Sequence, residues 1–509
     1  MNNRVVRECE SGCDYVLPDY MGDVKKLLVS RARAVPTGKF IGDESIEVSG
    51  IVEYELLYTD SEGKLTVINA SSDYEESFRI ESEAVSTIID ESYVVNPRVR
   101  VTGPRRISMK ADVAVSILTV GEPSDAIEGD VFGTDHQPQI STRQIEYLSR
   151  RIINGEEKEY TEIVTAIAGV LCDDVEIMSA FARSEINSQR VENGEARLQG
   201  EIIVTAMLRS EDEAPYSVKK IIPFEEIIAS DEITAESKLA CSSRVISTKL
   251  TVPDGEDGCS VIASIISDYT IQILENKTCE IISDAFLTAN YTKNSYKTDK
   301  VKSLLAILSR KIQAVSEYSR EELMLGEAKE VFYSFATVRT SEMKIEDDIA
   351  SVVGEITVNG VACEFNVDGS VTYIPIKLAV PFAENLSVDC SVKDVCETEH
   401  STLVSDVLCS LEEGKLIVTV KLSVNAALMK TQDVKRLVSC QIGEDRGQDA
   451  NSCTVTVYYP KRGETLFEIA KKYGVTTARI AEKNSLSESA LSSADAEDSL
   501  VGIKRLLII

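Results

Sequence analysis

Residues 454–484 read TVTVYYPKRGETLFEIAKKYGVTTARIAEKN, and the chain closes with GIKRLLII at 502–509. Hydroxyl and apolar residues alternate over 454–459, the period of a half-buried strand. Thr465 and Glu468 have the spacing of a capping box that opens a helix, and Gly474 can end that helix in the left-handed conformation. Thr476 can cap a second short helix. The sequence therefore predicts a small module at 454–509 in the order strand, helix, helix, strand.

This module resembles a LysM domain, a βααβ unit that binds N-acetylglucosamine polymers such as peptidoglycan. The resemblance rests on Tyr458, Gly463-Glu464-Thr465-Leu466, Ile469-Ala470, Tyr473-Gly474, Ile480, Asn484, Leu486, Gly502, Leu506 and Ile508. It implies a groove between the first strand-to-helix loop and the loop before the last strand. The binding residues implied in this way are Arg462, Gly463, Glu464, Thr465, Leu466, Asn484, Ser485 and Leu486.

The module departs from the LysM pattern in its second loop. The insertion SESALSSADAEDS adds Asp495, Glu497 and Asp498 beside the expected groove. Pro460 occupies a strand position that usually holds valine, and Ile509 replaces the usual proline after the last strand. These departures weaken the case for glycan binding and leave a protein partner as an open alternative.

Charge is distributed unevenly along the 509 residues, whose formal net charge is −30. Residues 454–509 hold eight Lys/Arg and seven Asp/Glu, so the first 453 residues carry a net charge of −31. A surface this acidic repels phosphate backbones and anionic lipid, so nucleic-acid or membrane-surface binding by this part is disfavoured.

The start of the chain, MNNRVVRECESGCDYV, has no apolar export segment, and no stretch is apolar for long enough to span a membrane. Twelve cysteines lie at irregular spacings. Without an export signal they are expected to be reduced thiols rather than a disulfide framework. We therefore expect a cytoplasmic protein.

The first 440 residues contain a pattern that occurs three times. GIVEYELLYTDSEG at Gly50 is echoed by GEIIVTAMLRSEDE at Gly200 and by GEITVNGVACEFNVDG at Gly354. The offset is 150 residues from the first copy to the second and 304 from the first to the third. Each copy is rich in Val, Ile, Thr and Tyr in short alternating runs, which favours strands. Its later half predicts a hairpin, with PDGEDG or EEG as the turn.

The predicted fold is mainly β: three tandem sandwich-like repeats joined by short helices, followed by the α/β module. Helices are expected at 143–152 and 301–325, and a short one after Asp19 in DYVLPDYMGDVKKLL. The predicted boundaries are repeat 1 at 1–120, linker and helix at 121–150, repeat 2 at 151–278, helical connector at 279–325, repeat 3 at 326–440, linker at 441–453 and module at 454–509.

Residues that could carry catalysis are scarce. The two histidines, His136 and His400, have no partner at metal spacing, and the pairs Cys9/Cys13 and Cys390/Cys396 lack further ligands. Carboxylates are abundant, but they gather in turns such as Glu211-Asp212-Glu213, where solvation explains them. P-loop, GxSxG and HExxH motifs are absent from the sequence. We therefore expect no enzyme, no cofactor and no metal.

The phrase at 14–28, three strand-rich repeats and a terminal LysM together resemble the SPOCS-domain proteins of spore-forming Firmicutes. Within them the chain is similar to the SipL-like spore coat assembly proteins of clostridia. This resemblance implies a mother-cell cytoplasmic adaptor at the forespore surface, whose LysM domain docks onto the ATPase of the coat basement layer. The alternative is an envelope protein whose LysM domain holds peptidoglycan directly.

Overall fold

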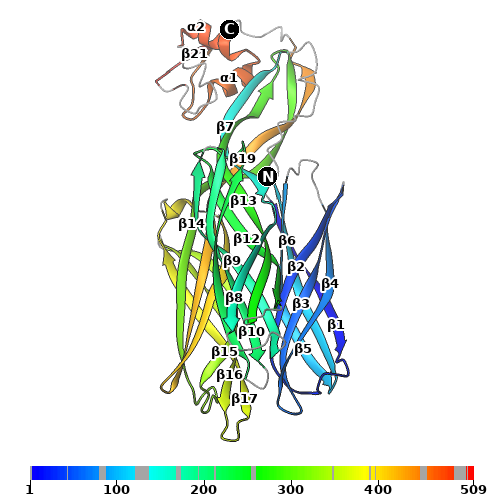
Figure 1. Ribbon diagram of the computed structural model, residues 1–509. Helices are drawn as coiled ribbons and strands as arrows, with labels where there is room; N and C mark the ends of the chain where they lie inside the picture. Colours follow the sequence, from blue (N-terminus) through cyan, green and yellow to red (C-terminus); the bar gives the residue numbers. More distant parts are fainter. Residues whose placement is uncertain are drawn as a thin grey trace. The chain divides into compact units, whose positions relative to one another are not determined.

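The structure is a computed structural model, and it describes residues 3–42, 44–79, 87–120, 137–167, 174–192, 194–210, 214–253, 259–346, 349–388, 391–395, 397–447, 455–486, 500 and 502–508. Most of these residues lie in antiparallel strands (Figure 1). The prediction of a mainly β protein is confirmed. By its internal contacts the chain divides into two compact units. Met1–Glu122, Arg150–Glu275 and Leu305–Met429 form the first unit, and Pro123–Ser149, Asn276–Leu304 and Lys430–Ile509 form the second.

The first unit contains three pairs of facing sheets, which we call sandwiches. The first sandwich has the sheet orders β1-β6-β5 and β2-β3-β4. Its strands are β1 (Asn3–Val16), β2 (Val24–Ile41), β3 (Ser45–Asp60), β4 (Leu65–Arg79), β5 (Thr87–Gly103) and β6 (Arg106–Val120).

The second sandwich has the orders β12-β13-β7, with β8 also pairing β13, and β11-β10-β9. Its strands are β7 (Gln139–Asn154), β8 (Lys158–Ile167), β9 (Val175–Glu192), β10 (Glu195–Ser210), β11 (Tyr216–Ala229), β12 (Lys238–Thr251) and β13 (Cys259–Phe286).

The third sandwich has the orders β14-β19-β18 and β15-β16-β17. Its strands are β14 (Asn290–Ser319), β15 (Glu330–Glu346), β16 (Ile349–Phe365), β17 (Val371–Leu386), β18 (Glu397–Glu412) and β19 (Lys415–Asp445), with a 3₁₀ turn at Val392–Asp394. The hairpins expected in the later halves of the second and third copies are confirmed as β12–β13 and β18–β19.

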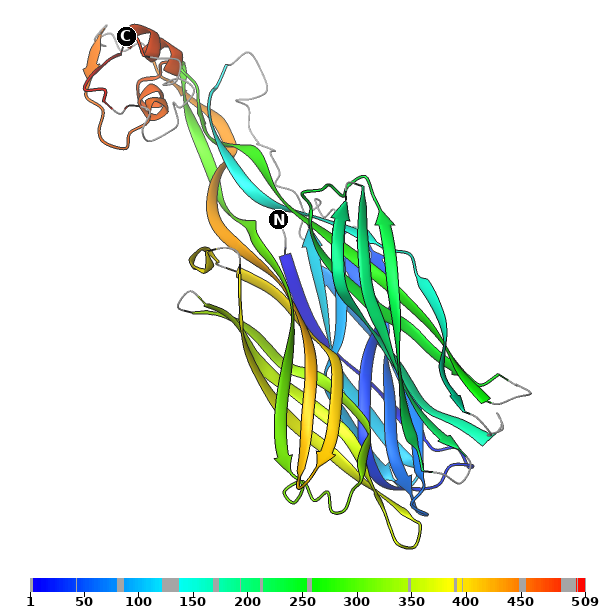
Figure 2. The ribbon, with the colours of Figure 1, turned by 60° about the vertical axis from the view of Figure 1, so that its left-hand side comes forward.

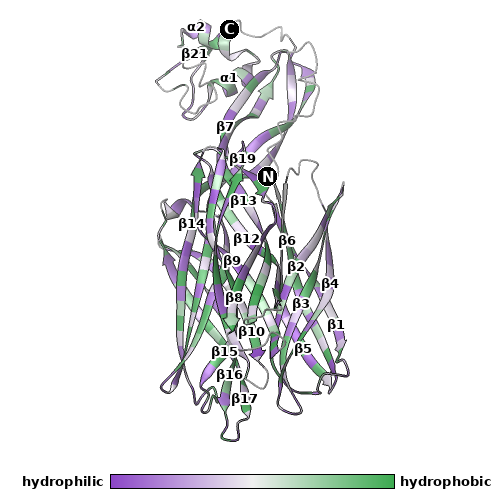
Figure 3. Cartoon of the chain, in the orientation of Figure 1, coloured by the Kyte–Doolittle hydropathy of each residue, from purple (hydrophilic) through white to green (hydrophobic). Residues whose placement is uncertain are grey.

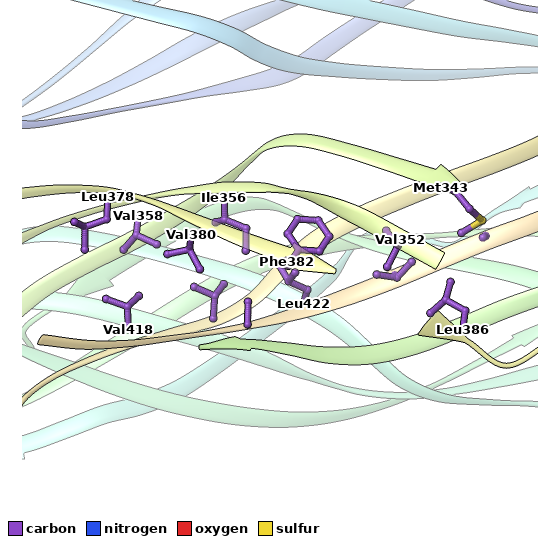
Figure 4. Close-up of a cluster of buried hydrophobic side chains, with 14 of the residues drawn as sticks. Met343, Val352, Ile356, Val358, Leu378, Val380, Phe382, Leu386, Val418 and Leu422 are labelled. Atoms are coloured by element: carbon purple, nitrogen blue, oxygen red, sulfur yellow. The ribbon is translucent and has the colours of Figure 1, made fainter. Parts of the chain in front are cut away.

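Apolar and polar residues alternate along the strands (Figure 3), and the apolar ones build one core inside each sandwich. Residues of β16, for example, alternate so that Val352, Ile356 and Val358 are fully buried. In the third sandwich these side chains meet Val418 and Leu422 of β19 from the facing sheet (Figure 4). The first and second sandwiches have corresponding clusters. Each sandwich is therefore held by apolar burial between its two sheets.

The strand registers follow the offsets of 150 and 304 at the repeated glycines, whereas Phe382 of the third copy lies 308 residues after Tyr74. The glycine of each repeat lies opposite an aromatic residue in the next strand: Gly50 opposite Tyr74, Gly200 opposite Phe224 and Gly354 opposite Phe382. A Cβ at Gly50 or Gly200 would collide with the opposing ring and with a carbonyl of the other neighbouring strand. Only glycine leaves room for the ring to lie over the backbone.

One sheet of each sandwich is formed by three consecutive strands, and we call these sheets the meanders: β2-β3-β4, β11-β10-β9 and β15-β16-β17. The three meanders contact one another in a cycle. Strand β4 contacts β9, β11 contacts β15, and β17 contacts β2. Residues from all three meanders form one further buried cluster, which we call the central cluster. It includes Leu28, Leu57, Met178, Met207, Phe332 and Val361. The offsets of 150 and 304 relate them as two positions in three copies. Leu28, Met178 and Phe332 occupy one position, and Leu57, Met207 and Val361 occupy the other.

A buried carboxylate lies in the central cluster. Glu55 is 6% exposed and accepts hydrogen bonds from Tyr333 Oη at 2.6 Å and Ser179 Oγ at 2.5 Å. The Arg31 guanidinium lies 3.4 Å from the same carboxylate and stacks over the Phe181 ring. Burial next to this charge raises the pKa of Tyr333 well above its ordinary value. One carboxylate thus joins all three sandwiches.

The second unit contains stretches of four long strands and the C-terminal module (Figure 2). In it β13 pairs with β7 and β14 with β19, giving two antiparallel ribbons. Each of the four strands contributes one residue to a shared apolar cluster: Ile145, Ile281, Val301 and Val434. We call this four-stranded part the stalk.

Three predictions of helix are wrong. Residues 143–152 lie in β7, residues 301–319 lie in β14, and the chain after Asp19 turns and enters β2 at Val24. The predicted linker at 441–453 also begins inside β19, which continues to Asp445. Apolar residues at helical spacing in these segments also fit a period of two, and pairing with neighbouring strands decides between the two. The remainder of the predicted linkers at 121–136 and 448–453 lies outside the described residues.

Candidate functional site

The C-terminal module consists of β20 (Thr456–Tyr458), α1 (Leu466–Tyr473), α2 (Thr477–Asn484) and β21 (Leu506–Ile508). Thr465 and Glu468 form the predicted capping box, and Gly474 ends α1 in the left-handed conformation. Thr476 caps α2 by accepting a hydrogen bond from the Arg479 amide. These predictions of helix ends are confirmed. The buried face of the module contains Leu466, Phe467, Ile469, Ala470, Ile480, Leu500, Leu506 and Ile508.

The first loop of the expected groove is held by Glu464. Its carboxylate accepts hydrogen bonds from Tyr458 Oη at 2.8 Å and from the Lys461 amide at 2.7 Å. The Lys461 amide bond, followed by that of Tyr458, lowers the pKa of Glu464. The same bond to Glu464, helped by burial, raises the pKa of Tyr458 to about 12. Glu464 therefore fixes the loop against β20.

Two residues of this loop face solvent. Gly463 has a φ of 85°, and an added Cβ would meet no atom within 4 Å. Glycine is needed here for its backbone conformation, because L side chains rarely adopt a positive φ. Arg462 is exposed and makes no hydrogen bond or ion pair with any residue that the structure describes. The open side of the loop is therefore a glycine backbone beside a cation.

Thr465 and Leu466 serve the fold. Thr465 is buried and its hydroxyl is occupied by the capping bond to the Glu468 amide. Leu466 is fully buried in the module core. Neither side chain is available to a ligand in this arrangement.

The second loop begins with a clamp between α2 and β21. Asn484 Nδ2 donates to Leu507 O at 2.7 Å, and Asn484 Oδ1 accepts from the Leu507 amide at 2.6 Å. Ser485 follows with a φ of 53° and is exposed, and Leu486 packs against the module core. Asp495, Glu497 and Asp498, expected beside the groove, lie outside the described residues.

The structure attaches both loops to one small sheet. Tyr458, which holds Glu464, pairs with Leu506, and the neighbouring Val457 pairs with Leu507, which is clamped by Asn484. Of the eight predicted site residues, Arg462, Gly463 and Ser485 are the ones left exposed. Glu464 and Asn484 are positioned but occupied by bonds within the module.

The other face of this sheet is apolar and exposed, a feature that the sequence interpretation missed. Val455, Val457, Tyr459 and Leu507 are 49%, 49%, 68% and 37% exposed. We call these four residues the outer face. The alternation of apolar residues over 455–459 could have revealed it, because the inward positions are Thr456 and Tyr458. The described part of the module carries all eight of its Lys/Arg but only three of its seven Asp/Glu. Over its whole length the module has a net charge of +1, so the outer face is an apolar patch on a module of nearly balanced charge.

The residues singled out from the sequence for metal binding or catalysis lie apart from the module. In that part no three His, Cys, Asp or Glu side chains lie close enough to hold a metal ion. His400 Nε2 lies 3.2 Å from Ser341 O in the third sandwich, while His136 and Cys390/Cys396 fall outside the described residues. Cys9 and Cys13 line the first core, and burial raises the pKa of both thiols. Both described helices are too short to cross a membrane.

Comparison with known families identifies the module. The LysM domain family matches residues 461–493, from the first loop through α2. No curated protein matches the chain. The chain thus carries a LysM domain, a class of module that binds N-acetylglucosamine glycans, at the end of a β-sandwich protein. The earlier resemblance of these residues to LysM is confirmed.

Proposed function

We propose that this chain is a non-enzymatic adaptor of spore coat assembly, acting in the mother-cell cytoplasm at the forespore surface. In this proposal the three sandwiches are copies of one SPOCS-like unit and form the scaffold. The LysM domain, as a βααβ docking head, binds the ATPase of the coat basement layer. Support comes from the SipL-like combination of repeats and LysM, and from the equal registers of the three meanders.

The observation that carries protein docking is the outer face of the LysM domain. The exposed Val457 and Leu507 are cross-strand partners in the two-stranded sheet, and the exposed Val455 and Tyr459 lie next to the two ends of β20. Exposed apolar patches with polar surroundings are typical of protein–protein contacts. The module's net charge of +1 differs from the −31 of the first 453 residues, so the module repels an acidic partner less than the rest of the chain does.

The second candidate function is binding of peptidoglycan or another N-acetylglucosamine glycan. The LysM match favours it, and the exposed backbone at Gly463 with Arg462 beside it offers an amide-rich contact for acetamido groups. An argument against glycan binding is that several groove residues already form hydrogen bonds within the module. Glu464, Thr465 and Asn484 would need to break existing hydrogen bonds to read a sugar.

The two functions can be separated with one pair of variants in the full chain. The face variant changes the outer face and combines Val457→Lys with Leu507→Glu. These residues are cross-strand partners, so the opposite charges should preserve the pairing of β20 with β21. The groove variant is Gly463→Asn, because asparagine tolerates a positive φ while adding a side chain. Each is tested for co-sedimentation with insoluble peptidoglycan and for binding to the purified coat ATPase.

We expect the face variant to lose ATPase binding by at least about tenfold, while the groove variant retains it. The second function would be established instead if the wild type bound peptidoglycan but not the ATPase, and if only the groove variant lost peptidoglycan binding. A fluorescent fusion in sporulating cells tests the location. A ring around the forespore is expected, and a signal along vegetative cell walls would contradict the proposal.

A further inference from the structure

The core of the LysM domain is completed by a residue from outside it. Phe286, the last residue of β13, is fully buried and belongs to the same apolar cluster as Leu466, Ile469 and Ile480. Its ring meets Phe467 of α1 edge to face, with 5.2 Å between centroids. A module that relied on its own residues would leave Phe467 exposed, which is unusual for a large aromatic side chain.

The end of α1 is held by a cation from the stalk. The last carbonyls of a helix have no partner within it and carry partial negative charge. Arg446, just after β19, donates from Nη2 to Lys471 O at 2.9 Å. Its own position is fixed, because the guanidinium lies over the Tyr291 ring and Nε donates to Asn290 O. Arg446 thus supplies a further partner for the carbonyls at the end of α1, in addition to the Gly474 cap.

A third contact is an ion pair with a prepared partner. Lys471 Nζ lies 2.5 Å from Asp284 Oδ2. The other oxygen of Asp284 accepts from Asn294 Nδ2 at 2.6 Å and from Tyr296 Oη at 2.8 Å. The carboxylate is therefore oriented by the stalk before it meets the lysine. Lys471 and Asp284 are 30% and 24% exposed, so solvent weakens the ion pair, and it orients the domain more than it stabilises the fold.

We propose that the stalk end is a seat that fixes the LysM domain in one orientation, with Phe286, Arg446 and Asp284 as positioning residues. The three contacts are of different kinds and all lie on α1 or its end. The outer face and the exposed side of the first loop take no part in them. The seat therefore holds the domain by one side and leaves the binding surfaces open.

If the proposed function holds, the fixed orientation of the LysM domain affects its affinity for the ATPase. A head held in one orientation has already lost the rotational freedom that a tethered module gives up on docking, so less binding free energy is spent on ordering. Loosening the seat should therefore weaken binding to the ATPase without any change on the outer face.

The test compares two neighbouring substitutions in the full chain. Phe286→Ala removes the ring from the LysM core, whereas Leu287→Ala removes a side chain that packs within the stalk against Leu437 and Cys440. Amide hydrogen exchange in 466–484 should rise by at least about tenfold in Phe286→Ala and stay near wild type in Leu287→Ala. Equal exchange in both variants and the wild type would overturn the seat.

A charge swap tests orientation separately from folding. Fluorophores are introduced as noncanonical amino acids at Ser295 in the stalk and Glu482 in α2, both exposed. Asp284→Lys should broaden the distance distribution between them, and Asp284→Lys with Lys471→Asp should narrow it again. A distribution already broad in the wild type would contradict the proposal. Because neither readout involves a ligand, failure of the proposed function would leave both results unchanged.

Discussion

At the scale of single residues, the LysM domain shows how side chains suggested by a binding motif can be occupied by the fold. Glu464 and Tyr458 illustrate this, because each changes the titration of the other. The pKa of Glu464 is lowered in the folded state, so its stabilisation is complete above its ordinary value. That stabilisation is lost as the pH falls through the lower folded value. Tyr458 has a raised pKa, so its contribution is present below its ordinary value and lost as the pH rises toward about 12.

Glu464→Gln should therefore lower the pKa of Tyr458 from about 12 toward its ordinary value. The amide removes the negative charge that opposes the phenolate and accepts a weaker hydrogen bond. The measurement is the titration of the Tyr458 ring by NMR in selectively labelled protein. Lys461→Ala serves as the control, because its amide bond to Glu464 comes from the backbone. An unchanged Tyr458 titration in Glu464→Gln would show that the bond is not formed in solution.

A second prediction at this scale concerns the stability of the first loop when Gly463 is substituted. Gly463→Ala should destabilise the first loop by about 1–2 kcal/mol, because an L residue at positive φ is strained although space is free. Gly463→Asn should cost less, since asparagine visits this conformation more readily. Exchange of the 461–465 amides measures both. Equal effects of the two substitutions would point to contact with another group instead of backbone strain.

At the scale of elements, Asn484 decides whether α2 and β21 stay together. Asn484→Ala removes both bonds to Leu507 and should destabilise the LysM domain by about 1–3 kcal/mol, as expected when backbone groups lose their partners. The exposed neighbour Lys483 provides a matched control, because Lys483→Ala leaves the clamp intact. Local hydrogen exchange in α2 reports the difference. Similar exchange in both variants would show that the clamp contributes nothing.

Local patterns predicted the helices of the LysM domain but failed for the long strands. The capping box and Gly474 act within a few residues, so sequence alone was sufficient. In β14, Leu304, Leu305, Leu308 and Ile312 fit a helix, yet the buried residues Leu304, Ala306 and Leu308 follow a period of two. The pairing with β19, more than a hundred residues away, decides the outcome. Such pairing is invisible to a local pattern.

The candidate site was predictable to a similar extent. The family motif located both loops, but it could not tell an exposed Arg462 from an occupied Asn484, since that depends on which bonds the fold completes. The outer face was readable from alternation in 455–459. Phe286 was not, because the residue that completes the LysM core lies about 170 positions before it in the chain.

At the scale of the whole molecule, Glu55 should couple the three sandwiches. Glu55→Ala leaves Arg31 and two hydroxyl groups of the central cluster without their carboxylate, and should cost about 3–5 kcal/mol. Glu53, two residues away in the same strand, forms an exposed pair with Arg33, so Glu53→Ala should cost at most about 1 kcal/mol. Urea unfolding of the full chain measures both free energies. Equal losses would show that the buried network carries no coupling.

The cycle of contacts β4–β9, β11–β15 and β17–β2 determines how many sandwiches such a protein can have. In a linear array the end units have a free side, so evolution can add or delete units while the rest stay folded. Here the third sandwich contacts the first, so among the described residues each sandwich has a neighbour on both sides. Loss of one would leave two mismatched surfaces exposed. Adding a fourth sandwich by gene duplication would therefore require one of these three contacts to open.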